Sequence, residues 1–230
     1  MTRTGSPRQS RASEEVAAQI LQAFYAEGLK PGEWLGTEAG LAERFSVSRV
    51  TIRDAVGALS ARGLLDVRVG ARGGLRIARS DPERLIDAFS IQLRLMGLSR
   101  DELFEAMLAI EPVTASLAAQ RATGVQLATL ENLLQQSCEA LDDAPRFAQL
   151  SVNFHQAVAE ASNNRALCAS LAALRATQLE HLGPETTRPI AERVCHIHAT
   201  ILEAIAAQNA DLARQLMKEH VSVVSHGVLF

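Results

Sequence analysis

Arg49 and Arg53 are well placed in this sequence to contact a phosphate or the edge of a base. They stand four residues apart, so on a helix they project from one face. Aliphatic residues recur at helical spacing on the other face: Ile52, Ala55, Val56 and Leu59. A helix with one packed face and one face carrying guanidinium groups can enter the major groove of DNA. The pattern therefore predicts a recognition helix.

Thr37 and Ser48 are the residues expected to begin the two helices of this region. Each precedes an apolar helical pattern and can cap it by accepting a hydrogen bond from a backbone N–H. A reciprocal capping box is not expected, because Gly40 and Thr51 rather than Glu stand three residues further on. Two short capped helices joined by a tight turn form a helix-turn-helix.

A glycine-rich turn follows the second helix, between two short alternations of apolar and polar residues within 63–78. This pattern predicts a β-hairpin. Arg72 lies at its tip, with Arg68 and Arg76 nearby. The hairpin would suit a wing that reaches phosphates or the minor groove.

The charge of the chain is divided unevenly. Residues 1–80 hold 12 Lys and Arg against 8 Asp and Glu, a net charge of +4, whereas residues 81–230 hold 11 against 18, a net charge of −7. The basic part suits a nucleic-acid partner and the acidic part would repel phosphate. We therefore expect a disordered tail over 1–10, a winged helix-turn-helix domain over 11–80 and a second domain over 81–230.

The segment 81–230 shows helical periodicity broken by short polar turns. We expect it to be an all-α bundle of seven antiparallel helices. The expected helices are 82–96, 101–121, 125–141, 144–161, 164–182, 189–207 and 210–224. The chain as a whole is thus expected to be mainly α.

Composition indicates a cytoplasmic protein. No apolar run approaches the roughly 20 residues needed to span a bilayer, so no membrane partner is expected. The three cysteines, Cys138, Cys168 and Cys195, are widely spaced and form no C-x-x-C pair. We therefore interpret them as small apolar residues of the core.

The N-terminal motifs resemble the winged-helix domain of GntR-type transcription regulators. The matching stretches run from Leu29-Lys-Pro-Gly-Glu through Leu41-Ala-Glu-Arg-Phe-Ser-Val-Ser-Arg and Ile52-Arg-Asp-Ala-Val to Gly73-Gly. The resemblance implies a homodimer that binds double-stranded DNA at a short inverted repeat. The DNA-binding residues that it implies are Ser48, Arg49, Thr51 and Arg53, with Arg72 and Gly73 in the wing.

The C-terminal segment resembles the FCD ligand-binding domain of the FadR-like branch of this family. The matching pieces include Ile110-Glu-Pro, Phe154-His155, His198 with Ile201-Leu-Glu-Ala-Ile, and His220-Val. The resemblance implies a divalent transition metal, such as Zn, Ni or Mn, held by His155, His198 and His220. The family's Asp, four residues before the first of these histidines, is Ser151 in this chain. The site would therefore contain three neutral imidazoles.

A second departure from the FCD pattern concerns the effector. Where many FCD domains carry an arginine that pairs with an organic acid, this chain has Met107. Either another cation binds the effector or the effector is more apolar than a simple organic acid. The expected candidates for effector binding are Met107, Ser151, Asn153, Arg175, Arg188 and Arg193.

Three functions are compatible with these patterns. The favoured hypothesis is a regulator, expected to be a repressor, that responds to a small carboxylate or acyl metabolite and is not an enzyme. The alternative is a metal-dependent hydrolase that uses the three histidines, but it requires a general base near the metal. Glu160 lies five residues from His155 and thus on another side of the helix. An architectural DNA-binding protein is a third hypothesis, although a winged helix alone would suffice for that role.

Overall fold

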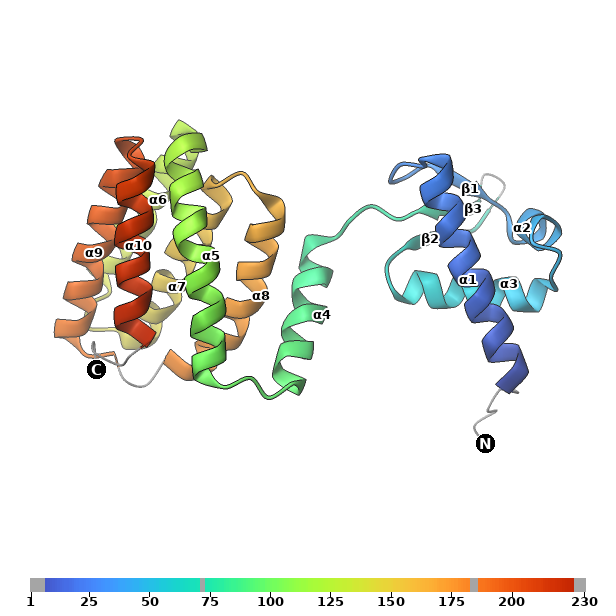
Figure 1. The fold of residues 1–230 in the computed structure, drawn as a ribbon, viewed down its shortest axis with the longest axis horizontal. Coiled ribbons are helices and arrows are strands. Elements are labelled where there is room, and N and C mark those ends of the chain that lie inside the picture. The colour runs from blue at the N-terminus through green and yellow to red at the C-terminus, as the bar shows by residue number, and fades with distance from the viewer. Residues whose placement is uncertain (1–6, 71–72, 183–185, 226–230) are drawn as a thin grey trace. The chain divides into compact units, whose positions relative to one another are not determined.

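The computed structural model describes residues 7–70, 73–182 and 186–225 of the chain (Figure 1). The chain divides between Asp81 and Pro82 into two compact units, which are described separately below. Among the described residues, no helix is long and apolar enough to cross a membrane.

In the N-terminal unit, the described residues form three helices and a small antiparallel sheet. The strands β1, β2 and β3 pair in the order β1-β3-β2. Side chains from all three helices and the sheet share one core. The elements are α1 (Pro7–Glu27), β1 (Trp34–Gly36), α2 (Glu38–Arg44), α3 (Arg49–Ala61), β2 (Leu65–Arg68) and β3 (Gly74–Ile77).

Helix α1 corrects one boundary expected from the sequence. It begins at Pro7, so residues 7–10 are helical and do not belong to a disordered tail that extends to residue 10. Proline suits the first turn of a helix because its φ is already helical and its missing N–H is not needed there. Val16, Ala17 and Ile20 fix the helix by packing against the domain core. Residues 1–6 lie outside the described part of the chain.

The two predicted caps are present. The Thr37 hydroxyl accepts from the backbone N–H of Gly40, and the Ser48 hydroxyl accepts from that of Thr51. Both caps are single, as the absence of Glu at the third helical position predicts. They define the tight turn that orients α3 relative to α2.

The described residues of the C-terminal unit form seven helices, which confirms the all-α prediction. Every helix boundary lies within two residues of the expected one. Helix α5 packs against α7, α8 and α10, and α6 packs against α7 and α9. The helices are α4 (Pro82–Leu95), α5 (Arg100–Arg121), α6 (Gly124–Glu139), α7 (Ala144–Ala161), α8 (Arg165–Leu182), α9 (Arg188–Ala206) and α10 (Ala210–Ser225).

The cysteines of this unit correct a second expectation. Cys138 is exposed on the last turn of α6, Cys168 is half-buried on α8, and Cys195 is buried on α9. The interpretation of all three as core residues is therefore wrong for Cys138.

Gly74 and Gly57 lead to opposite predictions for replacement by alanine. Gly74 has φ +130°, and a Cβ there would lie 2.7 Å from Nε1 of Trp34 and 2.8 Å from the carbonyl oxygen of Gly36. We expect Gly74→Ala to lower the free energy of unfolding of the N-terminal unit by about 1–3 kcal/mol. Gly57 is exposed in α3, and a Cβ there meets no described atom within 4 Å. Gly57→Ala should raise that free energy by about 0.5–1 kcal/mol.

Urea unfolding followed by tryptophan fluorescence measures both changes, because Trp34 is the single tryptophan and belongs to this unit. Equal midpoints for the two variants would contradict the strained approach of Gly74 to β1.

Candidate functional site

The exposed face of α3 carries Arg49 and Arg53, as the sequence predicts. Ile52, Ala55, Val56 and Leu59 are buried on the opposite face, so the division between the two faces is confirmed. The guanidinium of Arg53 lies 3.5 Å from the Glu38 carboxylate of α2. Both groups remain partly exposed, so this ion pair is weak and leaves Arg53 accessible to another partner.

The hydroxyl groups of Ser48 and Thr51 lie at the N-terminus of α3. Their oxygen atoms are 2.9 Å apart, and the Ser48 oxygen also caps the helix. The N-terminus of a helix favours anions through its unpaired N–H groups and its dipole. This end of α3 therefore combines two hydroxyls and a guanidinium in a setting suited to a phosphate or a base edge.

Gly73 lies in the wing, where there is no space for a side chain. A Cβ at this position would lie 2.4 Å from the carbonyl oxygen of Arg68, and the Gly73 N–H donates to the Gly70 carbonyl at 2.8 Å. This gives Gly73 a structural role in closing the turn, which sequence reasoning had not assigned to it. Arg72, predicted for the same tip, lies outside the described residues.

His155, His198 and His220 converge in the C-terminal unit and are here called the histidine cluster. They come from α7, α9 and α10, three helices that pack around the core of this unit. The three Nε2 atoms form a triangle in which every side is 3.2 Å. All three side chains are buried, between 0 and 5% exposed.

Glu111 and Arg175 form a second layer behind His155. One Glu111 oxygen lies 2.5 Å from Nδ1 of His155, and the other accepts a hydrogen bond of 2.6 Å from the Arg175 guanidinium. Both Glu111 and Arg175 are almost fully buried. Because a carboxylate only accepts hydrogen bonds, the His155 proton resides on Nδ1 and its Nε2 keeps a lone pair directed at the triangle.

Burial lowers the pKa of all three imidazoles, and it is the largest cause in each case. The charge of Arg175 lowers the pKa of His155 further, and the neighbouring histidines lower the pKa of His198 further. The pKa of His220 falls to about 4, although the Glu111 carboxylate opposes part of that shift. The rings are therefore neutral near pH 7, which is the form that binds metal.

The triangle of nitrogens fits a single cation better than a set of hydrogen bonds. If His198 and His220 both donated to Nε2 of His155, their own 3.2 Å contact would place two N–H groups face to face. The centre of a 3.2 Å triangle is about 1.85 Å from each corner, so a cation with the usual Zn–N distance of about 2.0–2.1 Å can contact all three. The three nitrogen donors also suit Ni and leave further coordination positions for other ligands.

The immediate surroundings of the histidine cluster are largely apolar. The Phe154 ring stacks on His198, with 4.3 Å between ring centroids. Met107 is buried in the same core, one helical turn before Glu111 on α5. Ser151 is half-buried, one turn before His155 on α7. Among the described residues, Nδ1 of His198, Nδ1 of His220 and Nε of Arg175 are buried without a hydrogen-bond partner.

Three of the candidates for effector binding lie away from the histidine cluster. Asn153 is exposed and accepts a hydrogen bond from Gln149. Arg188 is engaged on the surface with Asp142 and Glu192, and Arg193 is exposed. Each belongs to an outward face of its helix, whereas Arg175 points inward and reaches the histidine cluster through Glu111.

Glu111 is the functional residue that the motif analysis did not assign. Its signal in the sequence is a single acidic residue inside the apolar stretch Met107-Leu-Ala-Ile-Glu-Pro-Val. A carboxylate in such a position is either paired or neutral, because an unpaired buried charge is too costly. Sequence alone does not reveal its partners, which lie 44 and 64 residues away.

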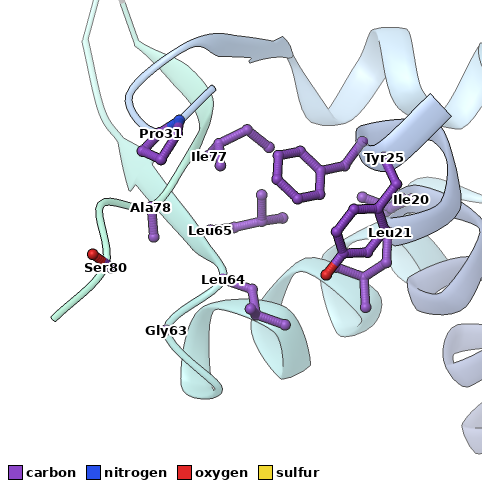
Figure 2. A pocket seen from close by; sticks show the side chains of 11 residues that line it. Ile20, Leu21, Tyr25, Pro31, Gly63, Leu64, Leu65, Ile77, Ala78 and Ser80 are labelled. Carbon is purple, nitrogen blue, oxygen red and sulfur yellow. The ribbon is translucent and has the colours of Figure 1, made fainter. Parts of the chain in front are cut away.

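A separate concavity lies on the N-terminal unit (Figure 2). Its volume is about 190 Å³, and its walls come from α1, from the start of β2 and from the segment after β3. The lining side chains are mostly aliphatic or aromatic, and the side-chain oxygen atoms drawn there are the hydroxyls of Tyr25 and Ser80. None of the described residues that line it is a histidine, an acid, a lysine or an arginine, so we assign it no chemistry.

Two family models match this chain, one in each unit. The family model for bacterial regulatory proteins of the gntR family matches residues 12–73, and the FCD domain model matches residues 102–223. The first match contains α3 with its arginines, and the second contains the whole histidine cluster together with Glu111 and Arg175.

Relatives match along nearly the whole chain. The HTH-type transcriptional repressor NanR of Salmonella newport is 29% identical over 233 residues, which cover 94% of this chain and 84% of that protein. NanR of Salmonella typhimurium has the same identity and covers 94% and 83%. The solved structure of Streptococcus agalactiae GntR is 29% identical with a TM-score of 0.64, covering 94% of this chain and 99% of that one.

These matches point to DNA-binding regulators and not to enzymes. The chain belongs to the GntR family of bacterial transcription regulators, with a helix-turn-helix DNA-binding domain followed by an FCD domain.

Proposed function

We propose that this regulator is a repressor whose FCD domain senses a small carboxylate through a bound transition metal. The observation that carries the proposal is the buried triangle of three Nε2 atoms, each 3.2 Å from the others. His155, His198 and His220 would hold Zn, Ni or Mn, and the metal would supply a positive centre with open coordination positions. The repressor role is supported by the name of the NanR relatives.

The charges around the histidine cluster favour an anionic effector. The three imidazoles are neutral, and the charges of Glu111 and Arg175 offset each other. With Ser151 in place of an acidic ligand, the charge of a divalent cation would be left uncompensated by the side chains around it. A carboxylate oxygen of the effector would both complete the coordination and neutralise part of that charge. Met107 and Phe154 would then face the apolar part of the molecule.

Arg175 has a different role from the one expected of a free effector-binding cation. Its guanidinium already donates to Glu111 and is 4% exposed, so its charge is largely satisfied. We propose that it holds Glu111 in place and that Glu111 in turn orients His155. In this proposal the metal, and not Arg175, contacts the effector carboxylate directly.

A hydrolase is not favoured. Metal-assisted hydrolysis needs a carboxylate or imidazole that is free to accept a proton from the attacking water. Both oxygens of Glu111 are already engaged, and it lies behind His155. Glu160 is exposed and accepts a hydrogen bond from Gln156.

We propose that Arg49 contacts a base edge or an adjacent phosphate at the start of α3, beside Ser48, Thr51 and Arg53. With an operator selected from random duplex DNA, Arg49→Ala should weaken specific binding by about 1–3 kcal/mol if its contact is bidentate to guanine. Fluorescence anisotropy at fixed salt measures the change. Arg62→Ala is the matched control, because Arg62 lies at the other end of α3, about 20 Å away along the helix. Equal loss in both variants would mean that the arginines provide only general charge.

The metal proposal predicts about one equivalent of bound transition metal per chain, measured by elemental analysis after loading with Zn or Ni and dialysis. His198→Ala should abolish this binding, because two imidazoles make a poor site. His196→Ala should leave it unchanged, since His196 is exposed on the same helix. Ser151→Asp should tighten binding by adding an anionic ligand one turn before His155.

The metal proposal would be refuted if the wild-type protein retains no metal after loading and Ser151→Asp does not change that result. The histidine cluster would then be a purely hydrogen-bonded polar core.

We further propose that the protein is a homodimer, because an inverted-repeat operator requires two recognition helices related by a two-fold axis. Helix α4 and Met96, which follows it directly, supply five of the seven large apolar side chains that the described part of the C-terminal unit exposes, and the four on α4 are Leu85, Phe89, Ile91 and Leu95. An exposed apolar surface of this kind is typical of a protein interface. We propose that it meets a second copy of the chain.

Sedimentation velocity at micromolar concentration should therefore give twice the 24.8 kDa mass of one chain. Leu95→Asp should shift the protein toward monomer, because a carboxylate would be buried in the interface. Val125→Asp provides the control, since Val125 on α6 is 79% exposed and Leu95 is 76% exposed. A wild-type monomer that still binds its operator tightly would overturn the proposal.

A further inference from the structure

Glu38 and Arg53 connect the two helices of the helix-turn-helix. Glu38 lies in the first turn of α2, and Arg53 lies in the second turn of α3. The contact involves one particular nitrogen, because Nε of Arg53 donates to a Glu38 carboxylate oxygen at 3.5 Å. The Glu38 side chain is 33% exposed and the Arg53 side chain is 72% exposed. The acceptor is thus the more enclosed partner, while most of the arginine remains open to solvent.

The use of Nε leaves the end of the guanidinium free. Arg53 carries two further nitrogens, Nη1 and Nη2, and among the described residues neither of them is paired with an acceptor. These two groups form a planar fork that can donate two parallel hydrogen bonds. In the major groove of DNA, the N7 and O6 atoms of guanine accept such a pair. Glu38 therefore engages Arg53 without occupying the edge that can read a base.

We propose that Glu38 is a positioning residue for DNA recognition, which holds Arg53 so that its two Nη groups read a guanine of the operator. This role rests on the proposed contact of α3 with an operator. It adds a residue of α2 to the DNA-binding residues expected from the motif, and Glu38 acts through Arg53 rather than by touching the DNA.

The ion pair gains in strength when DNA is bound. In the free protein water screens both groups, so the pair contributes little to folding. Entry of α3 into a groove removes part of this water, and the attraction between the two charges rises as the effective dielectric constant falls. An arginine that is already held also loses less rotamer freedom when it binds. The contribution of the pair is therefore expected in the complex more than in the free protein.

The charge of Glu38 makes this role separable from a general electrostatic effect. A carboxylate near DNA repels phosphate, so its neutralisation should tighten binding if charge alone matters. A positioning role has the opposite sign for the operator, because Arg53 loses its support. Glu43 supplies the matched comparison, since it is an exposed glutamate of the same helix and, among the described residues, no cation is paired with its carboxylate.

The test uses the full chain with two duplexes, one selected from random DNA by the wild-type protein and one of unrelated sequence. Fluorescence anisotropy at fixed salt measures the dissociation constants. Glu38→Gln should weaken binding to the selected duplex by about three- to tenfold, the range typical of coupled residues in contact. Its binding to unrelated DNA should be unchanged or tighter. Glu43→Gln should leave binding to both duplexes unchanged or tighter.

Two further readouts separate positioning from a change in folding. In an Arg53→Ala protein, Glu38→Gln should no longer weaken binding to the selected duplex, because the residue through which it acts is absent. Single base-pair replacements in that duplex should reveal one G·C pair at which the wild type discriminates, and at which Glu38→Gln and Arg53→Ala both lose discrimination. Urea unfolding followed by the fluorescence of Trp34 verifies that Glu38→Gln remains folded.

Equal effects of Glu38→Gln and Glu43→Gln on the selected duplex would overturn the positioning role. A further loss caused by Glu38→Gln in the Arg53→Ala protein would also overturn it, since Glu38 would then act independently of that arginine. A wild-type protein that binds both duplexes equally would instead contradict the proposed operator recognition, and the role of Glu38 with it.

Discussion

The carboxylate of Glu111 is the constraint around which the centre of the FCD domain is organised. It is 1% exposed and joins three helices, because its own helix α5 meets His155 of α7 and Arg175 of α8 through its two oxygens. Removing one member of such a buried ionic group typically costs about 3–5 kcal/mol, since the remaining charge stays in an apolar interior. The arrangement also fixes which nitrogen of His155 bears the proton, and hence the direction of its lone pair.

Much of the DNA-binding domain follows from local sequence signals. The caps at Thr37 and Ser48 and the aliphatic face of α3 involve residues within a few positions of one another, where helical spacing decides the geometry. The N-terminal helix α1 is harder to predict from local sequence. Its residues Val16 and Ile20 share a core with side chains of the distant elements α3 and β2, and no short-range pattern encodes that packing.

The candidate site in the FCD domain shows a similar division. The three histidines could be proposed because each matches a family position, and the structure brings all three Nε2 atoms together. The inward or outward direction of the cationic residues was harder to predict. Arg175, Arg188 and Arg193 are equivalent as residue types, yet only Arg175 faces the core, because the rotation of each helix depends on packing by all its neighbours.

The burial of the three imidazoles also links folding to proton uptake. In an unfolded chain these rings would bind protons near pH 6.5, whereas the folded pKa of His220 is about 4 and those of His155 and His198 are lowered too. The unfolded state therefore binds more protons as the pH falls below 6.5, and the free energy of unfolding decreases with it. For His220 alone this amounts to about 3 kcal/mol once the pH is below 4. The same desolvated core that keeps the imidazoles neutral thus makes the domain sensitive to acid denaturation.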